Sequence, residues 1–429
     1  MKLLKNHLAL AAIGTLLMRV LLLGTGFLTS VALARFLGPE KFGLYSYAMA
    51  IATLGAVVVG LGLPGLAIKE LAILDKKPDS NSFNEFILSS TAAIVVAGTS
   101  FAFLCILYWQ LIAREAGGLG GDYVFILVAI LVPISALFQL GESIFRSQGL
   151  AALSQVPELF FRRILLLILL GLLVGVLGVT LTVDMAMAAQ VALTSLGLIF
   201  YIIYIVKKIA KHYVSASLKF DISAKLKSAF PFMATSLVFV LSDQLGVLVI
   251  QSLSDLATVG FYRVAFRAAE LVVLVRGVAD IVIQPRIASM YAGQKHVELA
   301  RLIKSSARLT SIAAITVAGL MGIFRVYFLS LYGEAYAAAQ WAFLILLASQ
   351  VIAVMTGPVV SFLSMAGYQK QVLFAVFLSL IVNVILMVAF VPVYGLEGAA
   401  AANAVSLVMW NLALMYFAKV KLNYSLHVF

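Results

Sequence analysis

The sequence predicts an all-α integral membrane protein, and three observations carry this prediction. Of its 429 residues, 63% are hydrophobic and only 11% are charged, whereas a soluble domain averages roughly 45–50% apolar and about 25% charged residues. Apolar stretches of about 20 residues, the length that crosses a bilayer, recur along the whole chain. Basic residues gather in alternate connections between these stretches. So few charges cannot cover a water-facing surface, and we expect about twelve transmembrane helices in two six-helix lobes.

Twelve stretches are long and apolar enough to span a membrane. They lie at roughly residues 8–34, 44–66, 86–109, 123–145, 158–179, 184–206, 229–252, 260–283, 309–331, 336–360, 371–392 and 397–418. The first is too long for a cleaved secretory signal and contains Arg19, so it predicts a spanning helix. Gly38-Pro39 predicts a tight turn between the first two spans. The eighth span is the most charged, and the tenth has Pro358 near its end.

The distribution of Lys and Arg predicts the orientation, because cytoplasmic connections are enriched in basic residues. With the N-terminus inside, most of the 30 basic residues fall in cytoplasmic connections. The outside connections hold Arg35, Lys41, Arg114 and Arg325. Both termini are then cytoplasmic. The net charge of +12 reflects this orientation rather than a nucleic-acid-binding face, so no nucleic acid is expected as a partner.

A weak internal repeat divides the chain near its midpoint. Residues 42–48 (FGLYSYA) recur as 259–265 (VGFYRVA), and 145–149 (FRSQG) has a looser counterpart at 363–367 (LSMAG). Tandem repeats of this kind occur in transporters as parallel lobes related by an axis along the membrane normal. We predict an N-terminal lobe at 1–206, a basic cytoplasmic connector at 207–228 and a C-terminal lobe at 229–429.

Charged side chains inside the eighth span are the first candidate functional residues. They are Arg263, Arg267, Glu270, Arg276 and Asp280. One charge at the bilayer centre costs about 2.5–3.5 kcal/mol, so five would cost roughly 12–17 kcal/mol if they faced lipid. Helical periodicity places Arg263, Arg267 and Glu270 on one face. This polar stripe predicts either a water-filled cavity or a polar helix contact.

A purely structural interpretation of these charges stays open. Arg267–Glu270 and Arg276–Asp280 have helix-neighbour spacings and could neutralise each other. Arg263 would then have no local partner, which favours a ligand.

Charges in other spans extend the candidate set. Arg19 in the first span and Asp243 in the seventh are lone charges, and they could form a salt bridge between the lobes or face the same cleft. Glu142 and Arg146 lie one turn apart at the inner end of the fourth span. The fifth span opens with a basic pair, Arg162 and Arg163. These four residues are either interfacial anchors or a basic cytoplasmic mouth.

Neither a metal nor a cofactor is expected. Cys105 is the only cysteine, so the chain can form neither an internal disulfide nor a Cys-based metal site. The four histidines lie at the chain ends or in cytoplasmic connectors.

Four segments resemble a known family. The segment 34–45 (ARFLGPEKFGLY) resembles the signature of bacterial polysaccharide exporters of the O-antigen flippase type, within the multidrug/oligosaccharidyl-lipid/polysaccharide (MOP) exporter superfamily. Asn383 with 391–400 (VPVYGLEGAA) is similar to the penultimate loop of the same family, and 331–336 (LYGEAY) and 285–288 (PRIA) also fit. The four matches span the chain in order.

The resemblance implies the MOP flippase fold and a place in the bacterial cytoplasmic (inner) membrane. It also implies a polyprenyl-diphosphate-linked oligosaccharide as substrate, moved to the outer leaflet for O-antigen, lipopolysaccharide, capsule or exopolysaccharide biosynthesis. Membrane lipid and other polysaccharide-assembly membrane proteins are then expected partners. Guanidinium groups suit the diphosphate because they are planar and permanently charged.

Each candidate residue then takes an expected role. The substrate-binding cations would be Arg19, Arg263, Arg267 and Arg276. The carboxylates that could bind a coupling proton or sodium ion, or act in gating, are Glu142, Asp243, Glu270 and Asp280. The cytoplasmic mouth would be Arg146, Arg162 and Arg163.

Three other functions remain as alternatives. A small-molecule cation exporter of the same superfamily would require an acid-rich, aromatic cavity. An enzyme, a membrane glycan polymerase or ligase, would be expected to carry Arg or His in a long outside loop, and the predicted outside loops are short. A noncatalytic scaffold gives no reason for a charged eighth span. A non-enzymatic flippase is therefore the main hypothesis.

Overall fold

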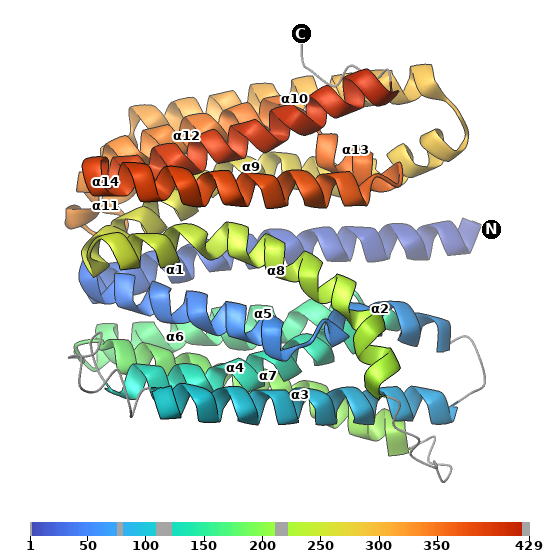
Figure 1. Cartoon of the computed structure of the whole chain (residues 1–429), viewed down its shortest axis with the longest axis horizontal. Helices are drawn as coiled ribbons and strands as arrows, with labels where there is room; N and C mark the ends of the chain where they lie inside the picture. Colours follow the sequence, from blue (N-terminus) through green and yellow to red (C-terminus); the bar gives the residue numbers. More distant parts are fainter. Residues whose placement is uncertain (1, 75–79, 109–121, 211–221, 423–429) are drawn as a thin grey trace. The chain divides into compact units, whose positions relative to one another are not determined.

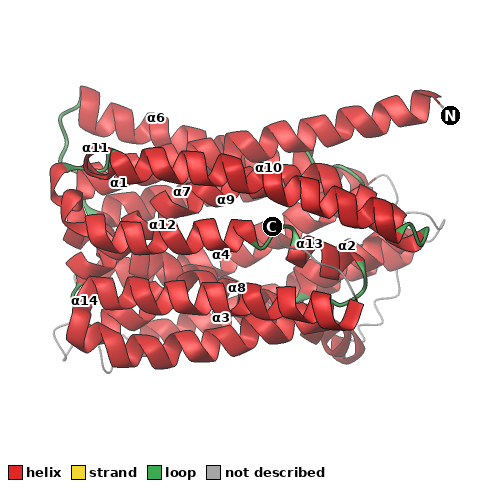
Figure 2. Cartoon of the chain, turned by 90° about the horizontal axis from the view of Figure 1, so that it is seen from above, coloured by secondary structure: helices red, strands yellow, loops and turns green. Residues whose placement is uncertain are grey.

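The computed structural model describes residues 2–74, 80–108, 122–210 and 222–422. This part of the chain is built from helices and contains no strand (Figure 1, Figure 2). It forms two compact units. The first, unit 1, comprises Met1–Leu37 and Tyr47–Val240, and the second, unit 2, comprises Gly38–Ser46 and Leu241–Phe429. The prediction of an all-α membrane protein is confirmed.

Unit 1 is organised around one central helix. Its elements are α1 (Lys2–Val59, without Gly38–Ser46), α2 (Leu63–Leu74), α3 (Ser80–Tyr108), α4 (Asp122–Ser147), η2 (Leu153–Gln155), α5 (Val156–Leu159), η3 (Phe160–Leu165), α6 (Leu166–Leu170), η4 (Gly171–Val176) and α7 (Val183–Ala210). The central helix α4 packs against α2, α3 and α7. Phe138, Phe145 and Tyr201 form a buried aromatic cluster between α4 and α7.

Unit 2 consists of Gly38–Ser46 from α1 and of the chain from Leu241 in α8 onward, and it also has a central helix. Its elements are the end of α8 (Ile222–Leu253), α9 (Leu256–Ala292), α10 (His296–Ile323), α11 (Arg325–Ser330), η5 (Glu334–Ala339), α12 (Gln340–Met355), α13 (Val359–Met365) and α14 (Gln369–Leu422). The central helix α12 packs against α9, α10 and α14. The core of this unit therefore lies around α12.

Nine helices in the described part of the chain are long and apolar enough to cross a membrane. Helix α14 contains two predicted spans, and α1 contains the first predicted span and most of the second, 44–66, whose last residues fall in the following turn and in α2. Each bends at a glycine in the left-handed region, Gly38 (φ 75°) and Gly395 (φ 54°), a conformation that costs glycine little because it has no Cβ. The turn predicted at Gly38-Pro39 is therefore confirmed. The eighth predicted span forms part of α9. This helix is not among the nine, because it contains too many charged residues to be counted as a membrane span from its composition.

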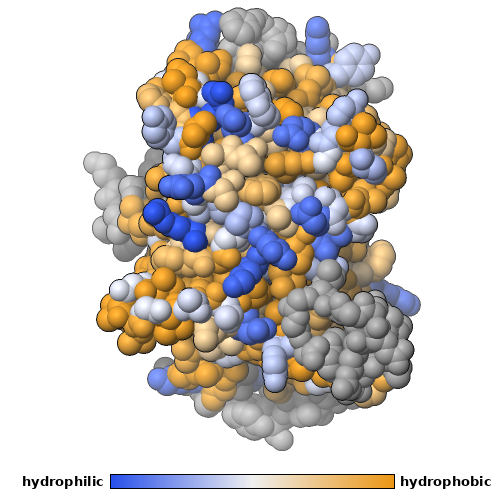
Figure 3. All heavy atoms as spheres, turned by 90° about the vertical axis from the view of Figure 1, so that its left-hand side faces the viewer, coloured by the Kyte–Doolittle hydropathy of each residue, from blue (hydrophilic) through white to orange (hydrophobic). Residues whose placement is uncertain are grey.

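Large apolar side chains on the helix flanks remain exposed. Examples are Val96 and Phe103 on α3, and Phe374 and Ile385 on α14. A soluble protein would cover most of such side chains, whereas a lipid-facing surface needs them exposed. Figure 3 shows the face of the molecule on which α11 lies, and there hydrophilic side chains are interspersed among hydrophobic ones. This contrast is the one expected between a hydrocarbon-facing flank and a membrane–water boundary.

Several predicted span boundaries differ from the observed helices, among them those of the ninth and tenth spans. The ninth span was expected at 309–331, but α10 runs from His296 to Ile323. Its first turns contain Arg301, Lys304 and Arg308. Hydropathy assigns such charged residues to a loop, but a helix can continue beyond the hydrocarbon layer. The tenth span was expected to reach 360, but α12 ends at Met355. Gly357 and Pro358 follow, and both residue types end helices.

The predicted connector 207–228 is partly helical, because α8 already begins at Ile222. Residues 211–221 lie outside the described part. A Cβ at Gly62, in the turn before α2, would overlap the carbonyl oxygen of Ala229 on α8, so the two backbones approach very closely. Lys225 Nζ donates to Ser89 Oγ at 2.9 Å and to Glu85 Oε1 at 3.3 Å. These contacts attach the first turns of α8 to unit 1. The predicted lobe boundaries stay predictions.

A reciprocal glycine contact joins the Gly38–Ser46 segment to the start of α9. A Cβ at Gly43 would overlap the carbonyl oxygen of Leu256, and a Cβ at Gly260 would overlap the carbonyl oxygen of Pro39. The spacing in sequence from Gly43 to Gly260 is the same as that from Pro39 to Leu256. Gly43 and Gly260 are equivalent positions of the predicted repeat, and Pro39 and Leu256 are equivalent as well. The contact between Gly43 and Leu256 therefore recurs, with the two copies exchanged, as the contact between Gly260 and Pro39. A pseudo-two-fold contact has this reciprocal form.

Candidate functional site

A short connection sets the level of the candidate residues on α8 and α9. Asp255 caps α9, where its side chain accepts a hydrogen bond from the Thr258 backbone N–H at 2.7 Å. Asp243 on α8 lies 3.3 Å from Arg267 on α9, so the two helices lie side by side at this level. Asp243 lies 12 residues before Asp255 and Arg267 lies 12 residues after it, so both are about 18 Å from the turn at 1.5 Å per residue. For a turn at the edge of a hydrocarbon core about 30 Å thick, this distance would correspond to the level of the midplane.

Arg267 connects two carboxylates at this level. Its Nη1 donates to Glu270 Oε2 at 2.6 Å, and its Nη2 donates to Asp243 Oδ2 at 3.3 Å. The side chain of Arg267 is 37% exposed, and those of Asp243 and Glu270 are each 31% exposed. The proposed Arg267–Glu270 pair is therefore present. It is not sealed away, so a polar guest could reach these groups.

Arg263 belongs to the same cluster but is incompletely paired. Its Nη1 lies 3.9 Å from Asp243 Oδ2, and its side chain is only 12% exposed. This nitrogen makes no hydrogen bond to any described residue. Gln244 donates a further hydrogen bond to Asp243. The α8–α9 cluster, defined as Asp243, Arg263, Arg267 and Glu270, thus holds two cations and two carboxylates with one guanidinium donor unused.

Asp243 was also considered as a partner of Arg19. The structure places Asp243 beside Arg263 and Arg267 of α9. Arg19 lies in α1, but its side chain is outside the described part of the chain, so its role stays a prediction.

The second charged pair of α9 lies apart from the α8–α9 cluster. Arg276 follows Arg267 by nine residues, which is about 14 Å along a helix. Its Nη1 donates to the carbonyl oxygen of Ala353 on α12 at 2.8 Å, and Asp280 lies one turn further on. Arg276 therefore ties α9 to the central helix of unit 2.

The predicted cytoplasmic-mouth residues form a second polar cluster within unit 1. Glu158 lies between two arginines, with Oε2 2.7 Å from Arg162 Nη1 and Oε1 3.1 Å from Arg163 Nη2. The guanidinium of Arg162 also lies over the Phe138 ring, 5.5 Å from its centroid. With its amide oxygen turned toward Arg162, Gln190 accepts from Nη2 at 3.2 Å. We call Glu158, Arg162, Arg163 and Gln190 the α5–α7 cluster.

Sequence reasoning missed two members of this cluster. Glu158 precedes Arg162 by four residues, and this spacing could have indicated the pair. Gln190 lies on a different helix, α7, and no local pattern links it to Arg162. The arginines stand in a π-helical segment, Phe160–Leu165, and a second π-helical segment follows at Gly171–Val176. Such segments are rare and frequently occur at functional sites.

Glu142 and Arg146 form the expected pair on α4, with Arg146 Nη2 donating to Glu142 Oε1. Arg146 is exposed and Glu142 is partly buried. Among the described residues, no group of three or more His, Cys, Asp or Glu side chains is placed to hold a metal ion.

Glu158→Gln is expected to lower the free energy of unfolding by about 1.5–3 kcal/mol, the usual worth of hydrogen bonds to charged groups. The substitution leaves Arg162 and Arg163 without their shared carboxylate in a mostly buried place. Unfolding in mixed detergent micelles measures the change. Glu298→Gln is the matched control, because the Lys295–Glu298 pair is more than half exposed and such pairs contribute about 0–1 kcal/mol. Equal effects of the two substitutions would contradict the structural role of Glu158.

Comparisons with known proteins support the fold. The profile of a family described as "Polysaccharide biosynthesis protein" matches residues 9–291. The lipid II flippase MurJ, inward closed, is similar in structure with a TM-score of 0.73 and 16% identity over 97% of this chain and 90% of that chain. A multidrug resistance MATE family transporter of the MOP superfamily, inward-facing, has a TM-score of 0.70 and 15% identity over 92% and 94% of the two chains.

A third similar structure is a MOP superfamily transporter from Pyrococcus furiosus, with a TM-score of 0.65 and 16% identity over 96% of this chain and 95% of that chain. A search of curated proteins finds no match to the sequence. At these identities the structural likeness establishes the fold, which is that of the MOP superfamily transporters.

Proposed function

The chain belongs to the polysaccharide biosynthesis protein family, and on this premise we propose that it is a flippase for a polyprenyl-diphosphate-linked oligosaccharide. It would move this lipid from the cytoplasmic to the outer leaflet of a bacterial inner membrane. The product would serve O-antigen, capsule or exopolysaccharide biosynthesis. Sugars and phosphates cannot cross hydrocarbon unaided, because each buried polar group without a partner costs several kcal/mol.

The observation that carries this proposal is the α8–α9 cluster. Arg263 and Arg267 lie near the level of the bilayer midplane, and Arg263 retains a guanidinium nitrogen without a hydrogen bond to the described residues. Arg267 is 37% exposed. Charges at this depth are costly and typically mark substrate or ion pathways. A diphosphate offers the anionic oxygens that two guanidinium groups bind best.

The carboxylates of the cluster suggest how substrate is released. Asp243 and Glu270 bind the same guanidinium groups that would bind the diphosphate. Substrate and carboxylates therefore compete for Arg267, and a proton or sodium ion on either carboxylate would favour the bound substrate. Loss of that ion would return the carboxylate to Arg267 and weaken substrate binding. Alternating access of the two sides of the membrane would then complete transport.

The remaining candidates take supporting roles in this proposal. Arg19 and Arg276 would extend the cationic path to the diphosphate, and Asp280 and Glu142 are further candidate ion or gating sites. Arg162 and Arg163 of the α5–α7 cluster, with Arg146, would attract the head group at the cytoplasmic side. Their pairing with Glu158 means that the substrate must also compete with a carboxylate there.

A small-molecule cation exporter is the second candidate function. Its supporting observation is the equal number of carboxylates and arginines in the α8–α9 cluster, since Asp243 and Glu270 could bind a cation after a rearrangement. The similarity in fold to a MATE family transporter is compatible with it.

Reconstitution separates these functions. We expect vesicles containing the pure protein to expose a fluorescent lipid-linked oligosaccharide to a membrane-impermeant reductant faster than protein-free vesicles do. No new glycosidic bond should form, as an enzyme would require. Accumulation of a cationic dye, without lipid transfer, would support the exporter instead. A well-folded preparation with neither activity would contradict both functions.

A further inference from the structure

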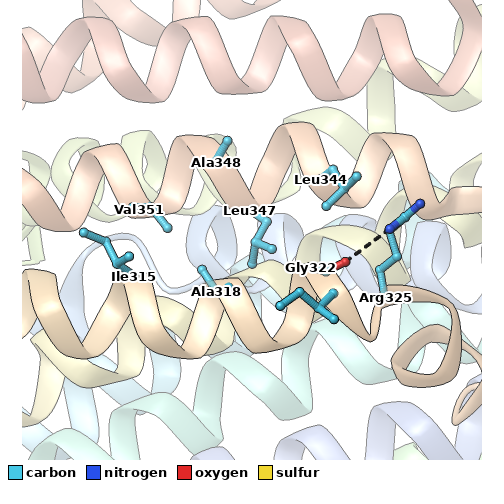
Figure 4. A pocket seen from close by; sticks show the side chains of 10 residues that line it. Ile315, Ala318, Gly322, Arg325, Leu344, Leu347, Ala348 and Val351 are labelled. Atoms are coloured by element: carbon cyan, nitrogen blue, oxygen red, sulfur yellow. Dashed lines mark hydrogen bonds between the residues drawn. The ribbon is translucent and has the colours of Figure 1, made fainter.

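An apolar groove with a cation at one end lies between α10 and α12 of unit 2 (Figure 4). Its volume is about 480 Å³. The apolar walls are made by Ile315 on α10 and by Leu344, Leu347 and Val351 on α12. No predicted site residue lines this groove, so it is distinct from both polar clusters.

Small residues make the groove hollow. Ala318 and Gly322 lie one turn apart on α10, and Gly319 and Ala348 also line the groove. A Cβ placed on Gly319 would meet no atom within 4 Å. Space for additional atoms is therefore present without any movement of the protein.

Arg325 closes one end of the groove. Its Nε donates to Gln340 Oε1 at 3.2 Å, and its Nη1 donates to the Gly322 carbonyl oxygen at 3.4 Å. Its guanidinium lies over the ring of Trp341, 5.5 Å from the centroid. Both hydrogen-bond acceptors are uncharged, so they hold the guanidinium in place without neutralising it.

The surroundings of Arg325 match a membrane interface. Trp341 is exposed, and so are Ile323 at the end of α10 and Tyr327 on α11. Trp and Tyr are enriched where hydrocarbon meets head groups. A guanidinium at head-group level attracts anionic lipids. The groove that starts at Arg325 is lined by apolar side chains, which suit an acyl chain.

We propose that the α10–α12 groove binds one acyl chain of an anionic phospholipid whose phosphate contacts Arg325. The lining residues Ile315 to Gly322 extend over seven helix steps, about 10 Å, which lies within a single leaflet of about 15 Å. In the orientation predicted from the basic residues, Arg325 faces the outer leaflet. The groove would thus hold a structural lipid of that leaflet against unit 2.

A second copy of the chain is the competing occupant. Ala318 and Gly322 have the small-xxx-small spacing that helix dimers use. A packed apolar helix would, however, remove water from the Arg325 guanidinium without neutralising it, and burying an unpaired charge is costly. A phosphate neutralises the same charge, so the charge favours the lipid.

Trp341 provides a local reporter for the test. A variant with Trp109→Phe and Trp410→Phe keeps Trp341 as the only tryptophan. It is placed in vesicles of phosphatidylcholine with increasing fractions of phosphatidylglycerol, with bromine on the acyl chains of one lipid at a time. We expect brominated phosphatidylglycerol to be enriched at Trp341 by about fivefold over phosphatidylcholine, the preference expected of one cationic side chain at a membrane surface.

Two substitutions and two matched controls decide the proposal. Arg325→Gln and Gly319→Leu should each abolish the lipid preference, the first by removing the charge and the second by filling the groove. Arg308→Gln and Thr316→Leu make the same changes at exposed positions of α10 outside the groove, and both should retain it. No preference in the parent protein, or an unchanged preference in Arg325→Gln, would overturn the proposal. The proposal would also be overturned if neither brominated lipid quenched Trp341 because the protein forms a dimer, and if Gly319→Leu dissociated that dimer.

Discussion

Arg267→Ala is expected to reduce the transfer of lipid-linked oligosaccharide by roughly 10- to 100-fold, because hydrogen bonds from a charged donor contribute about 1.5–3 kcal/mol. The same substitution should lower the free energy of unfolding by about 3 kcal/mol. This value is the lower end of the range for breaking a buried ion pair, chosen because Arg267, Asp243 and Glu270 are each about a third exposed. Initial rates in vesicles and unfolding in micelles measure the two effects.

A double variant separates the two roles of Arg267. Arg267→Met combined with Glu270→Leu replaces this ion pair by apolar side chains of similar size and leaves Asp243 beside Arg263, so neither remaining charge loses its last partner. Replacing a buried ion pair by apolar side chains of similar volume is often neutral or stabilising, and stability should recover. Transfer should stay low, because the diphosphate has lost a ligand. Recovery of transfer together with stability would show that Arg267 only neutralises its neighbours.

Gly43→Ala and Gly260→Ala are expected to destabilise the protein by about 3 kcal/mol each, at the upper end of the cost of overpacking. The added methyl groups would overlap the backbone oxygens of Leu256 and Pro39. A backbone oxygen cannot turn away as a flexible side chain can. Unfolding in micelles measures both effects. The double variant should lose less than the sum of the single losses, since one separation of the two backbones accommodates both methyl groups.

Gly277→Ala is the matched control on the same helix as Gly260. A Cβ there would meet no atom within 4 Å, and alanine in a helix interior is more favourable than glycine by about 0.5–1 kcal/mol. This variant should therefore gain stability. If Gly43→Ala and Gly260→Ala also left stability unchanged or raised it, the close backbone contact would be contradicted.

The reciprocal contact explains a pattern whose reason was not visible in the sequence. The residues 42–48 and 259–265 were recognised as a repeat because a glycine is followed two residues later by a tyrosine in both copies. Periodicity alone could not tell whether the glycine serves a turn or a close approach. The positive φ belongs to Gly38, whereas Gly43 and Gly260 are needed for packing.

Composition and hydropathy are sufficient to predict the membrane class and the order of the apolar helices, and helical periodicity predicts which charged residues share a face. These properties follow from composition and from the period of a single helix, and both are local. The polar face of Arg263, Arg267 and Glu270 could therefore be predicted before any partner was known.

Which groups these side chains meet depends on the packing of the helices. Asp243 on α8 binds Arg267 on α9, Ala353 on α12 accepts a hydrogen bond from Arg276 on α9, and Gln190 on α7 contacts Arg162 in η3. Such partners depend on how helices distant in sequence are packed and rotated, and hydropathy contains no information on either. The groove beside Arg325 could not be predicted for the same reason. Its two walls come from two helices, α10 and α12, and each sequence alone reads as an ordinary apolar span.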